Sequence, residues 1–144
     1  MRHDLVACMC TVACTKDRWY GDKSQSTLWE ENKPAANRDH PTSKPVSLVE
    51  RAILNSSGPG DVIVDLFGGS GSTLIACHRR ARKCRLMEID PLYADVIVRR
   101  WEAYTGQRAA LSSDGRSFKE VADQRVQKKS DGSAPDKGVA RGHK

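Results

Sequence analysis

A cluster of glycines between two acids is the part of this chain best suited to chemistry. The segment 65–73 reads DLFGGSGST, so that Asp65 lies near the end of an apolar run and glycines follow at 68, 69 and 71. Glu88 lies 19 residues beyond Gly69, near the end of the next apolar run. Glycines between a strand and a helix let a ligand approach the backbone closely. The pattern therefore predicts a ligand site at the end of a strand.

Two phosphate-binding loops are disfavoured by the residues that follow the glycines. A triphosphate-binding loop needs a lysine after its last glycine, whereas Gly71 is followed directly by Ser72 and Thr73. A dinucleotide-binding loop needs a third glycine where this chain has Leu74. An acid at position 65 is also an unfavourable neighbour for a pyrophosphate. Neither nucleotide class fits the loop.

S-adenosylmethionine fits these residues better, because it carries an amino-acid end and a ribose and has no phosphate. The N-terminus of the following helix would favour its carboxylate. Asp65 would bind the ammonium group, and Glu88 stands at the spacing of an acid that binds ribose hydroxyls. The alternative is that the glycines only form a tight turn and that Glu88 and Asp90 are capping or surface acids.

The elements around the loop follow from hydrophobic periodicity. Pro45 begins a helix with apolar residues at helical spacing, and Asp90 and Pro91 begin another that ends before Gly106. Residues 61–67 are apolar on both faces, as in a buried parallel strand. This alternation predicts an α/β fold with parallel strands and right-handed crossovers. The remaining elements are expected as a helix at 72–82, a strand at 83–89 and a short strand at 26–30.

Composition limits the protein to one small domain. The 144 residues carry a formal net charge of +6 and a pI of about 9.2, which weakly indicates a polyanionic partner. No apolar run is long enough for a membrane span and no signal-peptide pattern opens the chain, so we expect a cytoplasmic protein without membrane contact. Five cysteines are an odd number, which argues against a disulfide framework.

A metal site is not expected. The spacing of Cys8, Cys10 and Cys14 is not that of zinc ligands, so we interpret them as part of a cysteine-rich strand.

The basic runs at 79–82 and 99–100 are interpreted as solvated helix faces.

Three longer segments support a family assignment. They are HPTSKPVSLVERAI at 40–53, DLFGGSGST at 65–73 and MEIDPLYADVIVRRWEAYTG at 87–106. Together they resemble the C-terminal part of the S-adenosylmethionine-dependent DNA methyltransferases that modify the N6 amine of adenine or the N4 amine of cytosine. The HPTxKP motif precedes the glycine loop, as in the permuted β-type arrangement. The resemblance implies a partial class I methyltransferase fold, a Rossmann-like parallel sheet flanked by helices, with double-stranded DNA as substrate.

The resemblance also implies which residues bind the cofactor. The HPTxKP motif contributes to the methionine end of the pocket, and Lys44 steers the cofactor carboxylate by its charge. Phe67 lines the pocket, and Glu88 is the ribose acid. A solvated loop lysine at 44 and a plain core phenylalanine at 67 are the alternatives. The residues implied are His40, Thr42, Lys44, Pro45, Asp65, Phe67, Gly69, Gly71 and Glu88.

The chain departs from this family at the catalytic motif, in which Asp, Ser or Asn is followed by Pro-Pro and an aromatic residue that stacks on a flipped base. The 144 residues contain no such tetrapeptide, so we assign no catalytic residue. The nearest match is DPLY at 90–93, which we interpret as a helix start because Asp90 would cap it and Pro91 would open its first turn. We therefore expect the chain to be inactive by itself.

The sequence is compatible with two functions. The first is the cofactor-binding portion of a site-specific DNA methyltransferase, completed by a complementary N-terminal half. The alternative is an inactive remnant that acts as a basic DNA- or partner-binding module. We expect residues 1–23 to be a strand and loop from the catalytic half, residues 24–111 the cofactor-binding region, and residues 112–144 a short helix with a basic, mostly disordered tail.

Overall fold

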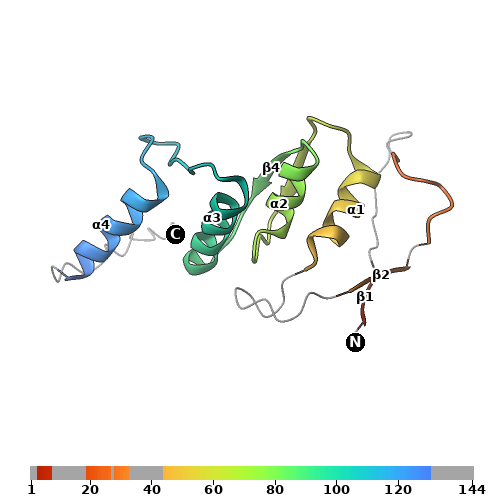
Figure 1. Ribbon diagram of the computed structural model, residues 1–144, viewed down its shortest axis with the longest axis horizontal. Coiled ribbons are helices and arrows are strands. Elements are labelled where there is room, and N and C mark those ends of the chain that lie inside the picture. Colours follow the sequence, from red (N-terminus) through yellow and green to blue (C-terminus); the bar gives the residue numbers. More distant parts are fainter. Residues whose placement is uncertain (1–2, 8–18, 27, 33–43, 131–144) are drawn as a thin grey trace, which may run out of the picture. The chain divides into compact units, whose positions relative to one another are not determined.

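The computed structural model describes residues 3–7, 19–26, 28–32 and 44–130 of the chain (Figure 1). The chain divides into two compact units, Met1–Gly106 and Gln107–Lys144. The division into three segments that the sequence suggests, with boundaries after residues 23 and 111, stays a prediction.

A small parallel sheet carries the glycine loop in the first unit. β3 (Val62–Asp65) and β4 (Lys83–Leu86) pair in parallel, with Val62 opposite Lys83 and Asp65 opposite Leu86. α2 (Ser72–Arg79) makes the crossover between the two strands and packs against β4. The expected α/β class with parallel strands is therefore confirmed.

The core of this unit lies between α1 (Val46–Ser56), α2 and one side of the sheet. Ile53 and Cys77 are buried there, and Ile63 and Cys84 pack against them. Burial raises the pKa of the Cys77 thiol to about 12, and the neighbouring Cys84 is the second cause. Cys77 is therefore a packed apolar group rather than a reactive thiol.

A buried acid joins the two helices of the core. Glu50 on α1 is 7% exposed and accepts hydrogen bonds from Arg79 at 3.0 Å and from Arg80 at 2.9 Å. Arg82 donates to the Ser57 hydroxyl at 3.2 Å. The interpretation of residues 79–82 as a solvated helix face is therefore wrong in part, because these guanidinium groups hold α1 against the end of α2.

α3 (Pro91–Thr105) begins and ends where the sequence predicts. Asp90 accepts a hydrogen bond from the Leu92 N–H at 2.8 Å, and Pro91 occupies the first turn. Gly106 follows the helix in a left-handed conformation with φ 69°. The interpretation of DPLY as a helix start is confirmed.

An antiparallel pair of strands precedes α1. β1 (His3–Ala7) pairs with β2 (Leu28–Asn32), which is the short strand expected near residues 26–30. Trp29 of β2 is buried, and the guanidinium carbon of Arg51 lies 4.7 Å from its ring centroid. This cation–π contact attaches β2 to α1.

The second unit contains α4 (Phe118–Ser130). Its start is a reciprocal cap, in which Glu120 Oε2 accepts from the Ser117 N–H at 2.7 Å and the Ser117 hydroxyl accepts from the Glu120 N–H at 3.3 Å. The disordered tail expected from the sequence includes residues 131–144, which lie outside the described residues.

The described ranges contain no helix that is both long and apolar enough to cross a membrane. Within the same ranges, no three His, Cys, Asp or Glu side chains gather where they could hold a metal ion. Cys8, Cys10 and Cys14 lie outside these ranges, so the absence of a metal site stays a prediction.

β3 corrects the expectation of a strand buried on both faces. Ile63 and Asp65 are half-buried, whereas Val62 and Val64 are 54% and 63% exposed. One side of the sheet is therefore open in the part of the chain that the structure describes.

α2 is shorter than expected and ends at Arg79 rather than at residue 82. Ala81 adopts a left-handed conformation with φ 56°. The Arg82 N–H then donates to the Cys77 carbonyl at 2.9 Å, and the Ala81 N–H to the His78 carbonyl at 3.4 Å. This Schellman closure normally has glycine where this chain has Ala81.

Ala81→Gly is expected to raise the free energy of unfolding by about 0.5–1 kcal/mol. The left-handed backbone costs a residue with a side chain roughly 1–2 kcal/mol, which exceeds the extra chain entropy that glycine loses. Urea denaturation of the full chain measures the change. Ala103→Gly, at an exposed position of α3, is the matched control and should lower the same free energy by about 1 kcal/mol. Losses of equal size in both variants would contradict this account of the end of α2.

Candidate functional site

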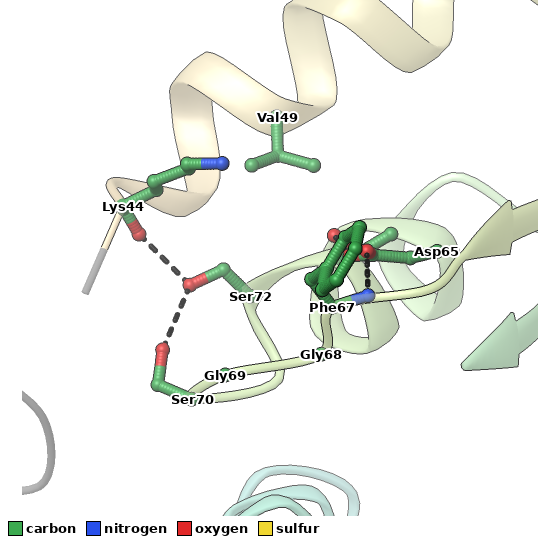
Figure 2. A pocket seen from close by; sticks show the side chains of 9 residues that line it. Lys44, Val49, Asp65, Phe67, Gly68, Gly69, Ser70 and Ser72 are labelled. Atoms are coloured by element: carbon green, nitrogen blue, oxygen red, sulfur yellow. Dashed lines mark hydrogen bonds between the residues drawn. The ribbon is translucent and has the colours of Figure 1, made fainter. Parts of the chain in front are cut away.

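A pocket opens at the carboxyl end of β3, beside the first turns of α1 and α2 (Figure 2). Ligands of α/β proteins bind at this end of parallel strands. The pocket is lined by Lys44, Val49, Asp65, Phe67, Gly68, Gly69, Ser70, Ser72 and Thr73.

The glycine loop follows a path that requires glycine. Gly69 and Gly71 have left-handed backbones, with φ 53° and 78°. A Cβ atom at Gly68 would lie 2.3 Å from Cδ2 of Leu86, so a side chain there would collide with β4. α2 begins directly after Gly71. A ligand in the pocket therefore meets bare backbone followed by a helix N-terminus.

Asp65 is held by two hydrogen bonds at the end of β3. Its Oδ1 accepts from the Phe67 N–H at 3.0 Å, and its Oδ2 accepts from the Thr73 hydroxyl at 2.6 Å. A carboxylate has about four acceptor positions. Asp65 therefore links the strand to the first turn of α2 and still has acceptor capacity for a ligand.

Glu88 joins the glycine loop to the start of α3. Its Oε2 accepts from the Gly69 N–H at 2.7 Å, and its Oε1 accepts from the Asp90 N–H at 3.0 Å. The spacing of 19 residues seen in the sequence thus corresponds to a direct contact. Because β3 and β4 run parallel, Asp65 and Glu88 lie at the same edge of the sheet.

Ser72 ties the start of α1 to the loop. Its hydroxyl donates to the Lys44 carbonyl at 2.8 Å and lies 3.4 Å from the Ser70 hydroxyl (Figure 2). The Lys44 side chain extends along the pocket toward Val49 (Figure 2). Lys44 is the positive group and Asp65 the negative group among the lining residues, so a ligand that carries both signs of charge has a partner for each.

Arg100 of α3 clamps the glycine loop. Its Nη1 donates to the Ser70 carbonyl at 2.9 Å and to the Ser70 hydroxyl at 3.1 Å, and it lies 3.4 Å from the Ser72 hydroxyl. Arg99, in contrast, has a side chain that is 62% exposed, and it pairs with Asp95 at 3.8 Å. The interpretation of residues 99–100 as solvated is therefore wrong for Arg100, whose partner lies 30 residues away in the sequence.

The residues predicted from the sequence fall into three groups. Some line the pocket, some adjoin its lining residues along the chain or by a hydrogen bond, and two lie outside the described residues. Phe67 is 88% exposed, so the alternative of a core phenylalanine is wrong. The residues that line the pocket are Lys44, Asp65, Phe67 and Gly69; the adjoining residues are Pro45, Gly71 and Glu88; and the residues outside the described ranges are His40 and Thr42.

The residues predicted from the sequence leave out five of the lining residues, Val49, Gly68, Ser70, Ser72 and Thr73. The three hydroxyl residues stand inside the DLFGGSGST segment itself. Short hydroxyl side chains at a helix N-terminus bond to nearby backbone and side-chain groups, so their position beside the glycines was a usable signal. Val49 lies one turn into α1, and its place was recoverable only from the packing of α1 beside the loop.

Comparisons with known proteins agree with one another. A family model described as DNA methylase matches residues 12–99. The type II methyltransferase M.Cfr9I of Citrobacter freundii is 36% identical over 81 residues, which are 56% of this chain and 27% of that protein. The DNA adenine methyltransferase YhdJ of Escherichia coli is 42% identical over 62 residues, which are 43% of this chain and 21% of that protein. The chain thus spans about a quarter of the length of these two curated relatives.

A solved structure supports the same relationship. The chain resembles M1.HpyAVI, solved as a complex with SAM, with a TM-score of 0.50 and 26% sequence identity. The similarity covers 58% of this chain and 43% of that chain.

Arg100→Met is expected to lower the free energy of unfolding by about 1–3 kcal/mol, because the Ser70 carbonyl loses its charged donor. Chemical denaturation of the full chain measures the loss. Arg99→Met is the matched control on the neighbouring position and should change the free energy by less than about 0.5 kcal/mol, since the Arg99 side chain is 62% exposed and exposed ion pairs contribute little to stability. A change at Arg100 no larger than that at Arg99 would show that the clamp does not hold the loop.

Proposed function

We propose, because the chain belongs to the DNA methylase family, that its glycine-loop pocket binds S-adenosylmethionine for methyl transfer to the N6 amine of adenine or the N4 amine of cytosine in DNA. The family and the α/β fold expected from the sequence are confirmed. One observation carries the proposal: Asp65, Glu88 and the bare glycine loop are hydrogen-bonded into one structure beside Lys44.

The residues of the pocket suit the chemistry of this cofactor. Its amino-acid end has a carboxylate for Lys44 and for the N-terminus of α2, and an ammonium group for Asp65. Glu88 holds the loop and stands where ribose hydroxyls would donate to its carboxylate. Phe67 offers an exposed aromatic wall. When bound, the cofactor supplies a methyl group on its sulfonium sulfur, and an amine attacks the carbon of that methyl group directly.

The roles of the remaining predicted residues are part of the same proposal. Pro45 sets the start of α1, where it precedes the first helical residue with φ −56°. This places the Lys44 carbonyl against Ser72. His40 and Thr42 complete the methionine end of the pocket through the HPTSKP motif.

Methyl transfer itself needs groups that this chain does not contain. The sequence has no Pro-Pro-Tyr or Pro-Pro-Phe segment to hold a flipped base. DPLY does not serve instead, because Asp90 is engaged as the cap of α3. We propose that a complementary methyltransferase part supplies the base-binding motif, that double-stranded DNA is the substrate, and that the protein acts in the cytoplasm.

Asp65→Ala and Glu88→Ala are each expected to weaken S-adenosylmethionine binding by about 1.5–3 kcal/mol, roughly 10- to 150-fold in Kd, because each removes a charged hydrogen-bond partner. Isothermal titration calorimetry on variants whose circular dichroism matches that of the parent chain measures the effect.

Asp61→Ala is the matched control for both variants. Asp61 also accepts a backbone hydrogen bond, from the Gly58 N–H at 2.9 Å, but it precedes β3 at the end away from the pocket. Its replacement should leave the Kd unchanged. Unchanged affinity for S-adenosylmethionine in both pocket variants would contradict the cofactor assignment and favour the alternative of an inactive DNA- or partner-binding module.

The purified chain is expected to transfer no methyl group to DNA by itself, because the motif that holds the base is missing. The assay uses labelled S-adenosylmethionine and unmethylated duplex DNA, with Tyr93→Ala as the paired variant. Incorporation of label into DNA above the blank, if it disappears in Tyr93→Ala, would contradict the prediction and identify DPLY as the active site.

A further inference from the structure

Arg100 is connected to the pocket through two serines. Its Nη1 donates to the carbonyl and the hydroxyl of Ser70 and lies 3.4 Å from the Ser72 hydroxyl. The Ser72 hydroxyl in turn donates to the Lys44 carbonyl at 2.8 Å. Ser70, Ser72 and Lys44 line the pocket, and Arg100 stands outside its lining. One guanidinium group on α3 is therefore linked by hydrogen bonds to three residues of the pocket wall.

The face of α3 that carries Arg100 also fits the shape of the glycine loop. Ile97, one helical turn before Arg100, is 5% exposed. A Cβ atom at Gly71 would lie 3.1 Å from Cγ2 of Ile97, and one at Gly68 would lie 3.0 Å from its Cδ1. Ile97 thus sets how closely the loop approaches α3, and Arg100 supplies the charged hydrogen bonds at that contact.

The hydrogen bonds of Arg100 are shielded from water at the end where they meet the loop. Ser70 and Ser72 are 5% and 6% exposed. Hydrogen bonds are stronger in such surroundings, and a buried carbonyl that loses its donor is costly to the structure. Water is therefore a poor substitute for the guanidinium group at this contact.

The pocket residues connected in this way lie together on one side of the pocket (Figure 2). α2 begins at Ser72 with no side-chain hydrogen bond to cap its first turn, which leaves backbone N–H groups for an anion. Lys44 adds its positive side chain there. Under the proposed function this side takes the carboxylate of the cofactor. Glu88, at the ribose, is held separately by the N–H groups of Gly69 and Asp90.

We propose that Arg100 is a positioning residue for the amino-acid end of the cofactor, which rests on the proposed function. By holding Ser70 and Ser72, it fixes the N-terminus of α2 against the Lys44 backbone, and it does not itself touch the cofactor. A wall that is ordered in advance loses less entropy on binding, so removal of Arg100 lowers affinity. Because the connection reaches one side of the pocket, the loss falls mainly on ligands that carry the amino-acid end.

The test compares two ligands of the full chain by isothermal titration calorimetry. They are S-adenosylmethionine and 5′-methylthioadenosine, which has the same adenosine and lacks the amino-acid end. Arg100→Met is expected to raise the Kd for S-adenosylmethionine about tenfold and the Kd for 5′-methylthioadenosine less than about threefold. Arg99→Met is the matched control and should leave both values unchanged, because the Arg99 side chain is 62% exposed and pairs with Asp95.

Two further variants carry the test if Arg100→Met does not fold. Arg100→Lys keeps the charge and loses the planar fork, and Ser72→Ala cuts the link to Lys44. Each should raise the Kd for S-adenosylmethionine more than that for 5′-methylthioadenosine. The double variant should raise it by less than the product of the two single effects, because both changes break one connection. Single effects that multiply would contradict the proposal.

Binding by the parent chain separates this inference from the proposed function. If the parent chain binds S-adenosylmethionine and Arg100→Met weakens both ligands equally, Arg100 is only structural and the positioning role is refuted alone. An unchanged Kd for S-adenosylmethionine in folded Arg100→Met refutes it equally. Absence of S-adenosylmethionine binding by the parent chain refutes the proposed function, and the positioning role with it.

Discussion

The parallel register of β3 and β4 is the constraint on which the site depends. With Asp65 level with Leu86, the two strands end at one edge, and Glu88 reaches the glycine loop that leaves β3. A shift by one residue would turn Glu88 to the other side of the sheet. The Glu88 carboxylate accepts hydrogen bonds from the N–H groups of Gly69 and Asp90, so it connects the glycine loop to the start of α3.

The loop is held from three directions before any ligand arrives. Glu88 binds it from the end of β4, Ser72 joins it to the Lys44 carbonyl at α1, and Arg100 holds Ser70 from α3. Left-handed glycines at 69 and 71 make this path possible, and Ile97 packs closely where Gly71 has no side chain. A loop fixed in this way loses little conformational entropy on binding, which is how preorganised sites gain affinity.

The sequence predicted correctly those structural features that depend on residues close to one another in the chain. Asp90, Pro91 and Gly106 marked the ends of α3 because capping involves neighbouring residues. The spacing of Glu88 indicated its position beside the glycine loop, because that spacing corresponds to one strand–helix–strand repeat. Arg100 was missed because a basic helical residue looks the same in sequence whether it faces solvent or a carbonyl. The end of α2 was missed because Ala81 occupies a position that glycine usually takes. The apolar composition of β3 predicted a strand buried on both faces, which is wrong for the described residues, because Val62 and Val64 are 54% and 63% exposed. Composition shows that a strand is apolar but does not show which of its faces another segment covers.

We propose that the edge formed by Asp65, the glycine loop and Glu88 binds S-adenosylmethionine. The most direct measurement is a titration of the ¹⁵N-labelled full chain with S-adenosylmethionine, followed by amide chemical shifts. Saturable shifts concentrated at Lys44, at residues 65–73 and at Glu88 are the expected result. Absence of saturable shifts, or shifts confined to residues away from this edge, would contradict the account.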